Sequence, residues 1–430
     1  MAEMIFSRSP YFIRTVVSGA HTGKVELYIY TGTSSGSWTG NVTYSLTATG
    51  VDAGAGQTEC IFEVAELIKD KFDLDISSKS NNTSGSFLDL SDLARSLCLK
   101  VDYRTYTDTG AGFVTLDTQL GLNAVLGYST YDEGSNFTVK EDTRHFYYDV
   151  PYIYKPFYAP VSLMIPKNYS SQVIAQGVKD FRQGTENVFM SPSTNSLTFI
   201  QYNMFFGFSG IFSPTFTSNR EQTNEVYSGR YPFPDTSGVK YVTTKRTKEM
   251  NYQDPKNAFD EIVFSQDANT EELVASKIKV RNVFDCEGYQ PYRIIFINKY
   301  GVVQDLWFFA NNILNLTVKS KSYKRNTVDF RNNSNNAISE FYRPQLAQQT
   351  VYDKNGQQTI ILNSGFYPET FNEAFEQLFL SEYCWLEYNN ATLPVILKDT
   401  AFKYKNSKTD GLINHTITFQ FANNYLNNIR

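Results

Sequence analysis

The side chains that most often carry chemistry are few in this sequence and far apart. Its three histidines, His21, His145 and His415, form no H-E-x-x-H or H-x-x-x-H pair, so their spacing does not favour a zinc site. Four cysteines are spread along the chain with no C-x-x-C pair. They are Cys60, Cys98, Cys286 and Cys384. We therefore expect buried free thiols, no metal and no other cofactor.

Nucleophilic and acid–base motifs are equally scarce. The sequence has no G-x-S-x-G elbow, and Gly19–Lys24 ends in Gly-Lys without the spacing or the Ser/Thr of a phosphate-binding loop. Asp73 and Asp75 are two residues apart, and the favoured interpretation is solvated loop acids. A glycosidase pair stays open as an alternative, because its carboxylates can come from any distance in the sequence. We expect a protein that is not an enzyme.

Basic side chains gather in two clusters, Lys240–Lys248 and Lys319–Arg325. Lysines commonly protect exposed strand edges, and we favour this role over nucleic-acid contact because the chain is acidic, with a net charge of −5. If the protein lined a passage for genomic DNA, the contacts would come from these clusters. The residues to test are Lys245, Arg246, Lys248, Lys319, Lys321, Lys324 and Arg325.

Most of the elements that must position these side chains are strands. Lys24–Thr31 and Asn41–Thr47 alternate with period two in β-branched and aromatic residues. Two amphipathic helices are expected, over Val64–Phe72 and Phe371–Leu380, each with one apolar stripe. A strand precedes and follows each helix, so we expect both helices to lie on a sheet.

The clearest hairpin covers Arg293–Phe309. Its turn, Asn298–Gly301, ends in a glycine that supplies the positive φ such turns need. We expect the core of the C-terminal domain to include the large apolar side chains of this hairpin and of two later strands. They are Ile295, Ile297, Trp307, Phe309, Trp385 and Phe421.

The strand patterns predict a mainly β protein with a few helices, and the length and composition predict a large one. The chain has 430 residues, of which 15% are aromatic and 19% charged, so it can bury large cores and large interfaces. We expect two β-sandwich-like α+β domains, at 1–150 and 285–430, and an extended or inserted β-structured middle region at 151–284. No run of about 18 apolar residues occurs, so we expect no membrane span.

Two segments near the middle carry more apolar surface than compact sandwiches need. Val150–Pro166 contains four prolines, and Leu197–Pro214 is rich in phenylalanine. Because soluble monomers avoid large exposed apolar patches, we expect both to be arms at the subunit contacts of a cyclic homo-oligomer. The alternative is that both fold back on their own domain. The candidate interface residues are Tyr152, Tyr154, Phe157, Tyr158, Phe205, Phe206, Phe208 and Phe212.

Several segments resemble structural proteins of tailed bacteriophages. In the first third they are Ser7–Arg14, Val25–Tyr30, Ala65–Phe72 and Gly127–Asn136. In the last third they are Pro291–Phe309, Leu362–Phe366, Leu380–Trp385, Pro394–Ile396 and Thr416–Ala422. These are packing motifs, and Pro151–Lys279 has no counterpart, so the resemblance implies no active site.

What the resemblance implies is a virion structural protein of the neck, tail or baseplate, as in short-tailed phages of gut bacteria. Such a protein would be made in the host cytoplasm, assemble into a ring or hub, and contact other tail, neck or portal proteins. The alternative is a receptor- or carbohydrate-binding protein at the tail tip, because tyrosine rings offer sugars an apolar face and a polar edge. Its candidate surface is Tyr147, Tyr148, Tyr152, Tyr154 and Tyr158.

Overall fold

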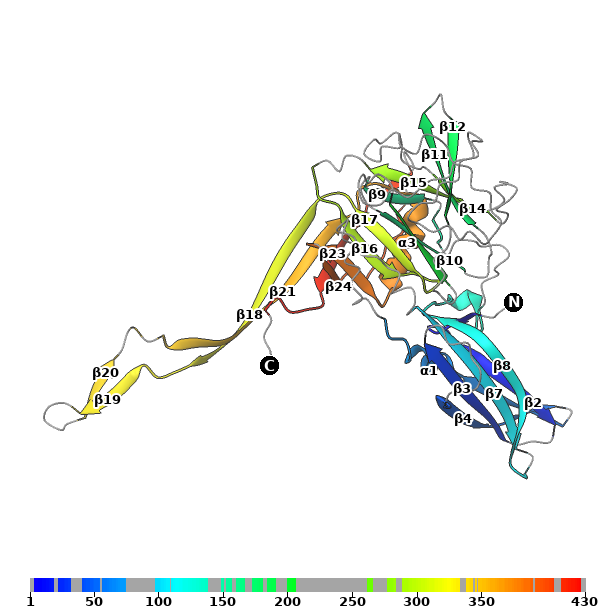
Figure 1. Ribbon diagram of the computed structural model, residues 1–430. Helices are drawn as coiled ribbons and strands as arrows, with labels where there is room; N and C mark the ends of the chain where they lie inside the picture. The colour runs from blue at the N-terminus through cyan, green and yellow to red at the C-terminus, as the bar shows by residue number, and fades with distance from the viewer. Residues whose placement is uncertain are drawn as a thin grey trace.

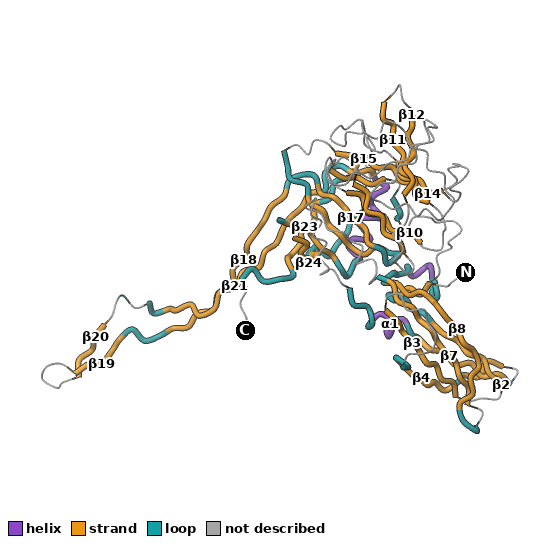
Figure 2. The backbone as a smooth tube through the Cα atoms, viewed as in Figure 1, coloured by secondary structure: helices purple, strands orange, loops and turns teal. Residues whose placement is uncertain are grey.

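The computed structural model confirms a mainly β fold with few helices (Figure 1 and Figure 2). It describes residues 4–18, 22–31, 41–54, 56–74, 97–108, 110–137, 148–150, 152–156, 160–166, 172–180, 184–190, 199–205, 261–265, 277–283, 288–332, 338–342, 345, 347–389, 391–405 and 411–426. In this part of the chain the α-helices are α1 (Ala65–Lys69) and α3 (Asn372–Leu380).

The N-terminal part is a two-layer β-sandwich. One layer has the order β1 (Met4–Phe6), β8 (Phe113–Val125), β7 (Cys98–Asp108), β3 (Thr22–Thr31), β4 (Tyr44–Thr49). The other has the order β2 (Phe12–Ser18), β6 (Gln57–Glu63), β5 (Val51–Gly54). Alternate residues of both layers meet in one core, which includes Ile13, Val25, Leu27, Phe62 and Val101. This alternation is the period-two pattern of the sequence, with one face of each strand buried.

Helix α1 closes one end of this sandwich and is shorter than the Val64–Phe72 helix that the stripe predicts. Ala65 and Ile68 are buried in the sandwich core. After Lys69 the chain turns, because the Lys71 and Phe72 amides bond three residues back rather than four. Phe72 thereby leaves the helix and packs at the border between this core and a second apolar cluster.

The C-terminal part is built on a seven-stranded sheet. Its order is β17 (Val303–Phe308), β16 (Tyr292–Ile297), β23 (Cys384–Tyr388), β24 (Ala391–Leu397), β26 (Thr416–Phe421), β21 (Gln349–Asn363), β18 (Asn312–Lys324). Helix α3 covers one face, as the apolar stripe predicts, with Ala374, Phe375 and Leu378 in the core. It follows the short strand β22 (Tyr367–Pro368), which pairs with β25 (Leu412–Ile413), and the 3-10 turn Glu369–Phe371.

The predicted hairpin is β16 and β17, and its two faces serve two different cores. Ile294 and Phe296 pack under α3, whereas Ile295 and Ile297 point to the opposite face. Gly301 has φ +75°, as the turn requires. Five of the six expected core residues are buried, and Phe309 is partly buried. Three of them, Ile295, Ile297 and Trp385, belong to the second face.

The middle region contributes further strands. A five-stranded sheet has the order β12 (Gly184–Met190), β11 (Gln172–Asp180), β14 (Glu261–Ser265), β15 (Lys277–Val283), β9 (Tyr152–Pro156). A separate pair joins β10 (Pro160–Pro166) to β13 (Phe199–Phe205). Strand β10 lies in Val150–Pro166 and β13 lies in Leu197–Pro214, the two segments that we expected to be arms. The described residues of the two segments pair with each other within one chain.

The element that does project from the body is a long hairpin (Figure 1). Strands β18 and β21 pair over the whole of β18, and β19 (Val328–Asn332) pairs with β20 (Ile338–Tyr342) beyond them. Only Thr359–Asn363 of β21 also pairs with β26. Just beyond that root, the Tyr425 amide donates to the Gly356 carbonyl at 2.9 Å, and Gln357 Nε2 donates to the Phe421 carbonyl at 2.6 Å. Farther out, no third described strand pairs with the hairpin. We call residues 312–363 the arm.

A tight joint holds the N-terminal sandwich against the C-terminal sheet. Ile295, Ile297 and Trp385 share an apolar cluster with Phe6 and Val125. The Asn298–Gly301 turn at the end of the hairpin lies directly on the chain that follows β8, where the Tyr128 amide donates to the Lys299 carbonyl at 2.8 Å. A Cβ atom added to Gly301 would lie 2.8 Å from the Gly127 nitrogen. The joint therefore requires glycine there for its φ and for its lack of a side chain.

Substitution of this glycine tests the joint. We expect Gly301→Ala to lower the thermal midpoint by more than Gly110→Ala does. Gly110 also has positive φ, at +88°, but a Cβ there would meet nothing within 4 Å, so this control carries the conformational cost alone. The extra cost at Gly301 is about 1–3 kcal/mol, typical of overpacking. Equal midpoints for the two variants in a thermal scan would contradict the close contact.

Candidate functional site

Metal-ligating side chains do not cluster in the described part of the chain. No group of three or more His, Cys, Asp or Glu residues that could hold a metal occurs there. His415 is stacked on Phe402, and burial lowers its pKa to about 4. Cys60 and Cys384 are buried free thiols, as expected, and burial raises the pKa of Cys384 to about 12. His415 therefore does not have the properties of a base at neutral pH, and Cys384 does not have those of a nucleophile.

The other residues that the sequence singled out for chemistry are placed only in part. His21, His145, Cys286 and Asp75 lie outside the described residues, and Asp73 is exposed. The described helices include none that is long and apolar enough to cross a membrane.

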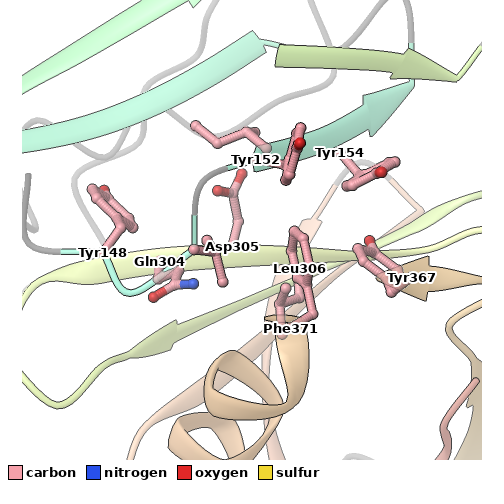
Figure 3. A pocket seen from close by; sticks show the side chains of 10 residues that line it. Tyr148, Tyr152, Tyr154, Gln304, Asp305, Leu306, Tyr367 and Phe371 are labelled. Carbon is pink, nitrogen blue, oxygen red and sulfur yellow. The ribbon is translucent and has the colours of Figure 1, made fainter. Parts of the chain in front are cut away.

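A small pocket lies between β9 and the C-terminal sheet (Figure 3). Tyr152 and Tyr154 face β17 and the start of α3, and the space among the lining side chains is about what one water molecule needs. Tyr154 packs edge-on against Tyr367 and Phe371, with ring centroids 5.1 and 5.5 Å apart. The tyrosine faces are thus used within the chain, and the pocket has no room for a sugar ring.

The tyrosines proposed for interfaces or sugars divide accordingly. Tyr148 is buried and donates to the Val303 carbonyl at 3.0 Å. Tyr152 and Tyr154 are half-buried against the C-terminal core. Phe205 ends β13, but its side chain is not among those described. The candidates that lie outside the described residues are Tyr147, Phe157, Tyr158, Phe206, Phe208, Phe212, Lys245, Arg246 and Lys248.

Two sets of ion pairs cross the joint. Lys299, in the hairpin turn, reaches Glu133 of the N-terminal part at 2.6 Å. Arg8 and Lys69, also N-terminal, both reach Glu382 of the C-terminal part, at 3.3 and 2.8 Å. These contacts surround the apolar cluster of the joint and orient the two parts.

The same pairs set the pKa values of their carboxyl groups. Burial alone would raise the pKa of Glu133, but hydrogen bonds from Lys299 and Thr130 hold it below the ordinary 4.5. Burial likewise opposes ionisation of Glu382, and its contacts with Lys69 and Arg8 outweigh that effect and lower its pKa. Both carboxylates are therefore charged at neutral pH and stabilise the joint.

The arm carries many exposed apolar side chains. Eight of them are between 44% and 64% exposed: Ile313, Leu314, Leu316, Val318, Tyr323, Phe330, Val351 and Tyr352. Leu314 is paired with Ile360, which is buried under α3, so the stripe Leu314–Leu316–Val318 continues the buried face of the sheet out along the arm. A two-stranded ribbon has no third layer to cover such a stripe.

Basic side chains lie on the same arm. Lys319, Lys321, Lys324 and Arg325 are all exposed, and Lys321 contacts Asp353 of the facing strand at 3.6 Å. Lys319 follows Val318 directly, so these two neighbours point to opposite faces of the ribbon. The register shifts after Lys321, a bulge that twists the outer half. The arm thus exposes both apolar and basic side chains, and Lys319 and Lys321 point away from the Leu314–Leu316–Val318 stripe.

Sequence reasoning placed the basic cluster on a strand edge but did not identify the arm as the projecting element. The signal was present as alternation in Asn312–Lys324, where Leu314, Leu316 and Val318 are spaced two residues apart. Alternation predicts that a strand has two different faces. It does not predict whether another element covers them.

The chain matches no protein-family model and no curated protein sequence. The candidate site is accordingly defined by its geometry alone: an exposed, basic and apolar arm on a body whose two halves are locked together.

Acidification tests the polar part of the joint. Since the pKa values of Glu133 and Glu382 are lower in the folded protein, the unfolded chain binds more protons. Their stabilisation is full above about pH 4.5 and is lost as the pH falls through the folded-state values. We expect the Glu133→Gln, Glu382→Gln double variant to be less stable at pH 7, by about 0.5–2 kcal/mol, and this difference from the wild type to shrink as the pH falls below about 4.5.

Thermal midpoints measured from pH 7 to pH 3 check this expectation. The control is Glu59→Gln. Glu59 pairs with Arg14 at 3.6 Å, and both residues belong to the N-terminal sandwich, so this ion pair does not cross the joint. A midpoint difference between the double variant and the wild type that stayed constant down to pH 3 would show that the two carboxylates do not act through their charge.

Proposed function

We propose that this chain is a structural component of a tailed bacteriophage particle, in its neck, tail or baseplate, and that copies of it assemble into a ring or hub. The observation that carries the proposal is the arm, a two-stranded ribbon with exposed apolar residues along both strands. Such a ribbon is marginal in water unless a third strand or another surface covers it. A neighbouring protein in an assembly supplies that cover.

The resemblance to phage structural proteins supports the same proposal at the joint. Two of the resembling segments, Gly127–Asn136 and Pro291–Phe309, meet there through the Tyr128–Lys299 hydrogen bond and the Glu133–Lys299 ion pair. Both segments therefore serve packing between parts of one chain. A rigid joint suits a building block, because it fixes the direction in which the arm leaves the body.

The proposed role is non-catalytic, and its partners are other copies of the chain and other virion proteins. The protein would be made in the host cytoplasm and end in the virion. Lys319, Lys321, Lys324 and Arg325 are exposed on the arm, where a passing contact with genomic DNA would reach them. The alternative role in binding a receptor or glycan gains no support from Tyr148, Tyr152 and Tyr154, which pack inside the chain.

Shortening the arm tests its role in assembly. Replacing residues 319–355 by Asn-Gly joins the paired Val318 and Gly356 through a two-residue turn. We expect this variant to keep the thermal midpoint of the body and to be monomeric by light scattering, whereas the full chain forms oligomers. In the control variant, Asn-Gly replaces only residues 326–347 and joins Arg325 to Gln348. This variant keeps Tyr323 and Tyr352, and we expect it to assemble.

Particle composition tests the place of the protein. We expect mass spectrometry of purified particles of the phage that encodes the chain to find it in multiple copies. We also expect particles made with only the short-arm variant to lack it. Its absence from wild-type particles would refute the proposal, and incorporation of the short-arm variant at the normal copy number would refute the role of the arm.

A further inference from the structure

A second uncovered apolar surface lies on the N-terminal sandwich. The outer half of β8, residues 113–120, is exposed at every position, and four large apolar side chains there are 44–56% exposed: Phe113, Val114, Leu116 and Leu120. Strand β1 pairs only with Asn123–Val125, so the outer half of β8 is a sheet edge with no partner on that side among the described strands. Free backbone donors and acceptors at such an edge can pair with another strand.

The two exposed apolar surfaces differ in charge. The arm, residues 312–363, has seven basic and three acidic residues, a net charge of +4. The first 150 residues have 11 basic and 19 acidic residues, a net charge of −8, whereas the whole chain is at −5. Opposite net charges steer two surfaces together and reject like-charged partners. Within this chain, the N-terminal part is therefore the part whose net charge best complements that of the arm.

The arm does not lie on that surface in its own chain. In Figure 1 the arm and the N-terminal sandwich, which contains the β7–β8 hairpin, extend from the C-terminal body in different directions, and no described strand of the arm pairs with β8. The joint fixes both directions. The two surfaces can therefore meet between two copies, each giving its arm to the next. A contact of this head-to-tail kind repeats, and it closes into a ring when the rotation per subunit allows.

We infer that the arm of one copy packs along the outer half of β8 of the next copy. The arm flanks both faces of β8 at this edge, with Phe113 on one face and Val114 on the other, and its apolar side chains contact these two residues, Leu116 and Leu120, while its lysines lie near the acidic N-terminal part. This inference rests on the proposed assembly function and adds the receiving surface to it. The occupant of the β8 edge is a second copy of this chain.

Mixing two defective variants tests the inference. The arm variant is Val318→Asp with Tyr352→Asp, and the edge variant is Leu116→Asp with Leu120→Asp. All four positions are 46–57% exposed, so we expect both variants to fold with unchanged thermal midpoints. Ile396→Asp, at a 52% exposed position on β24, is the matched control and is expected to assemble like the wild type.

Native mass spectrometry of the full-length chains then gives distinct outcomes. We expect each variant alone to be monomeric and an equal mixture to give one-to-one heterodimers and nothing larger, because only one intact arm and one intact edge remain per pair. An edge variant that assembles like the wild type would overturn the inference and leave the arm's role in assembly standing. A monomeric wild type that shifts only when duplex DNA is added would overturn both, with nucleic acid as the occupant of the arm.

Discussion

The close contact between the Asn298–Gly301 turn and the chain at Leu126–Gly127 determines how the rest of the structure is arranged. A Cβ at Gly127 would lie 2.9 Å from the Lys299 carbonyl oxygen, and one at Gly301 would lie equally close to the Leu126 nitrogen. Backbone therefore packs on backbone, and apolar side chains and ion pairs surround the contact. With the joint locked, the arm and the outer half of β8 point in fixed directions.

A buried charge network supports the sheet on the joint side. Arg293 is fully buried on the face of β16 that also carries Ile295, and its guanidinium donates to Asp305 at 2.7 Å and to Glu387 at 2.9 Å. These partners lie on the two strands that flank β16, so the network links three adjacent strands. Buried ion pairs are weak evidence of stability, but loss of one partner leaves a charge buried alone. The network accordingly favours one arrangement of the strands under the joint.

Local patterns predicted local structure well and long-range packing poorly. The β16–β17 hairpin, its glycine turn and the α3 stripe follow from residues within about 20 positions of one another, and the structure confirms them. Ile295 and Trp385 were correctly predicted to be buried, but that they face the N-terminal sandwich depends on contacts with Phe6 and Val125 far away in the sequence. Hydrophobicity shows that a side chain needs cover and does not identify what covers it.

The same limit explains the position of the arm. The apolar excess of Val150–Pro166 and Leu197–Pro214 suggested projecting segments, yet β10 and β13 within them pair with each other. Strand β18 carries its apolar residues in ordinary alternation, and it becomes an arm because β26 pairs with only five residues of β21. This difference in length between neighbouring strands is a property of the whole sheet. It cannot be predicted from any single segment of the sequence.

Hydrogen exchange followed against protein concentration tests most directly whether a neighbour covers the arm. We expect amides in 317–324, 349–356 and 113–120 to exchange quickly in dilute protein and to become protected together at concentrations where oligomers form. The buried hairpin strand β16, already paired on both sides, should stay unchanged and serve as the internal reference. Exchange in the arm and in β8 that does not depend on concentration, in a sample shown to be oligomeric, would contradict this account.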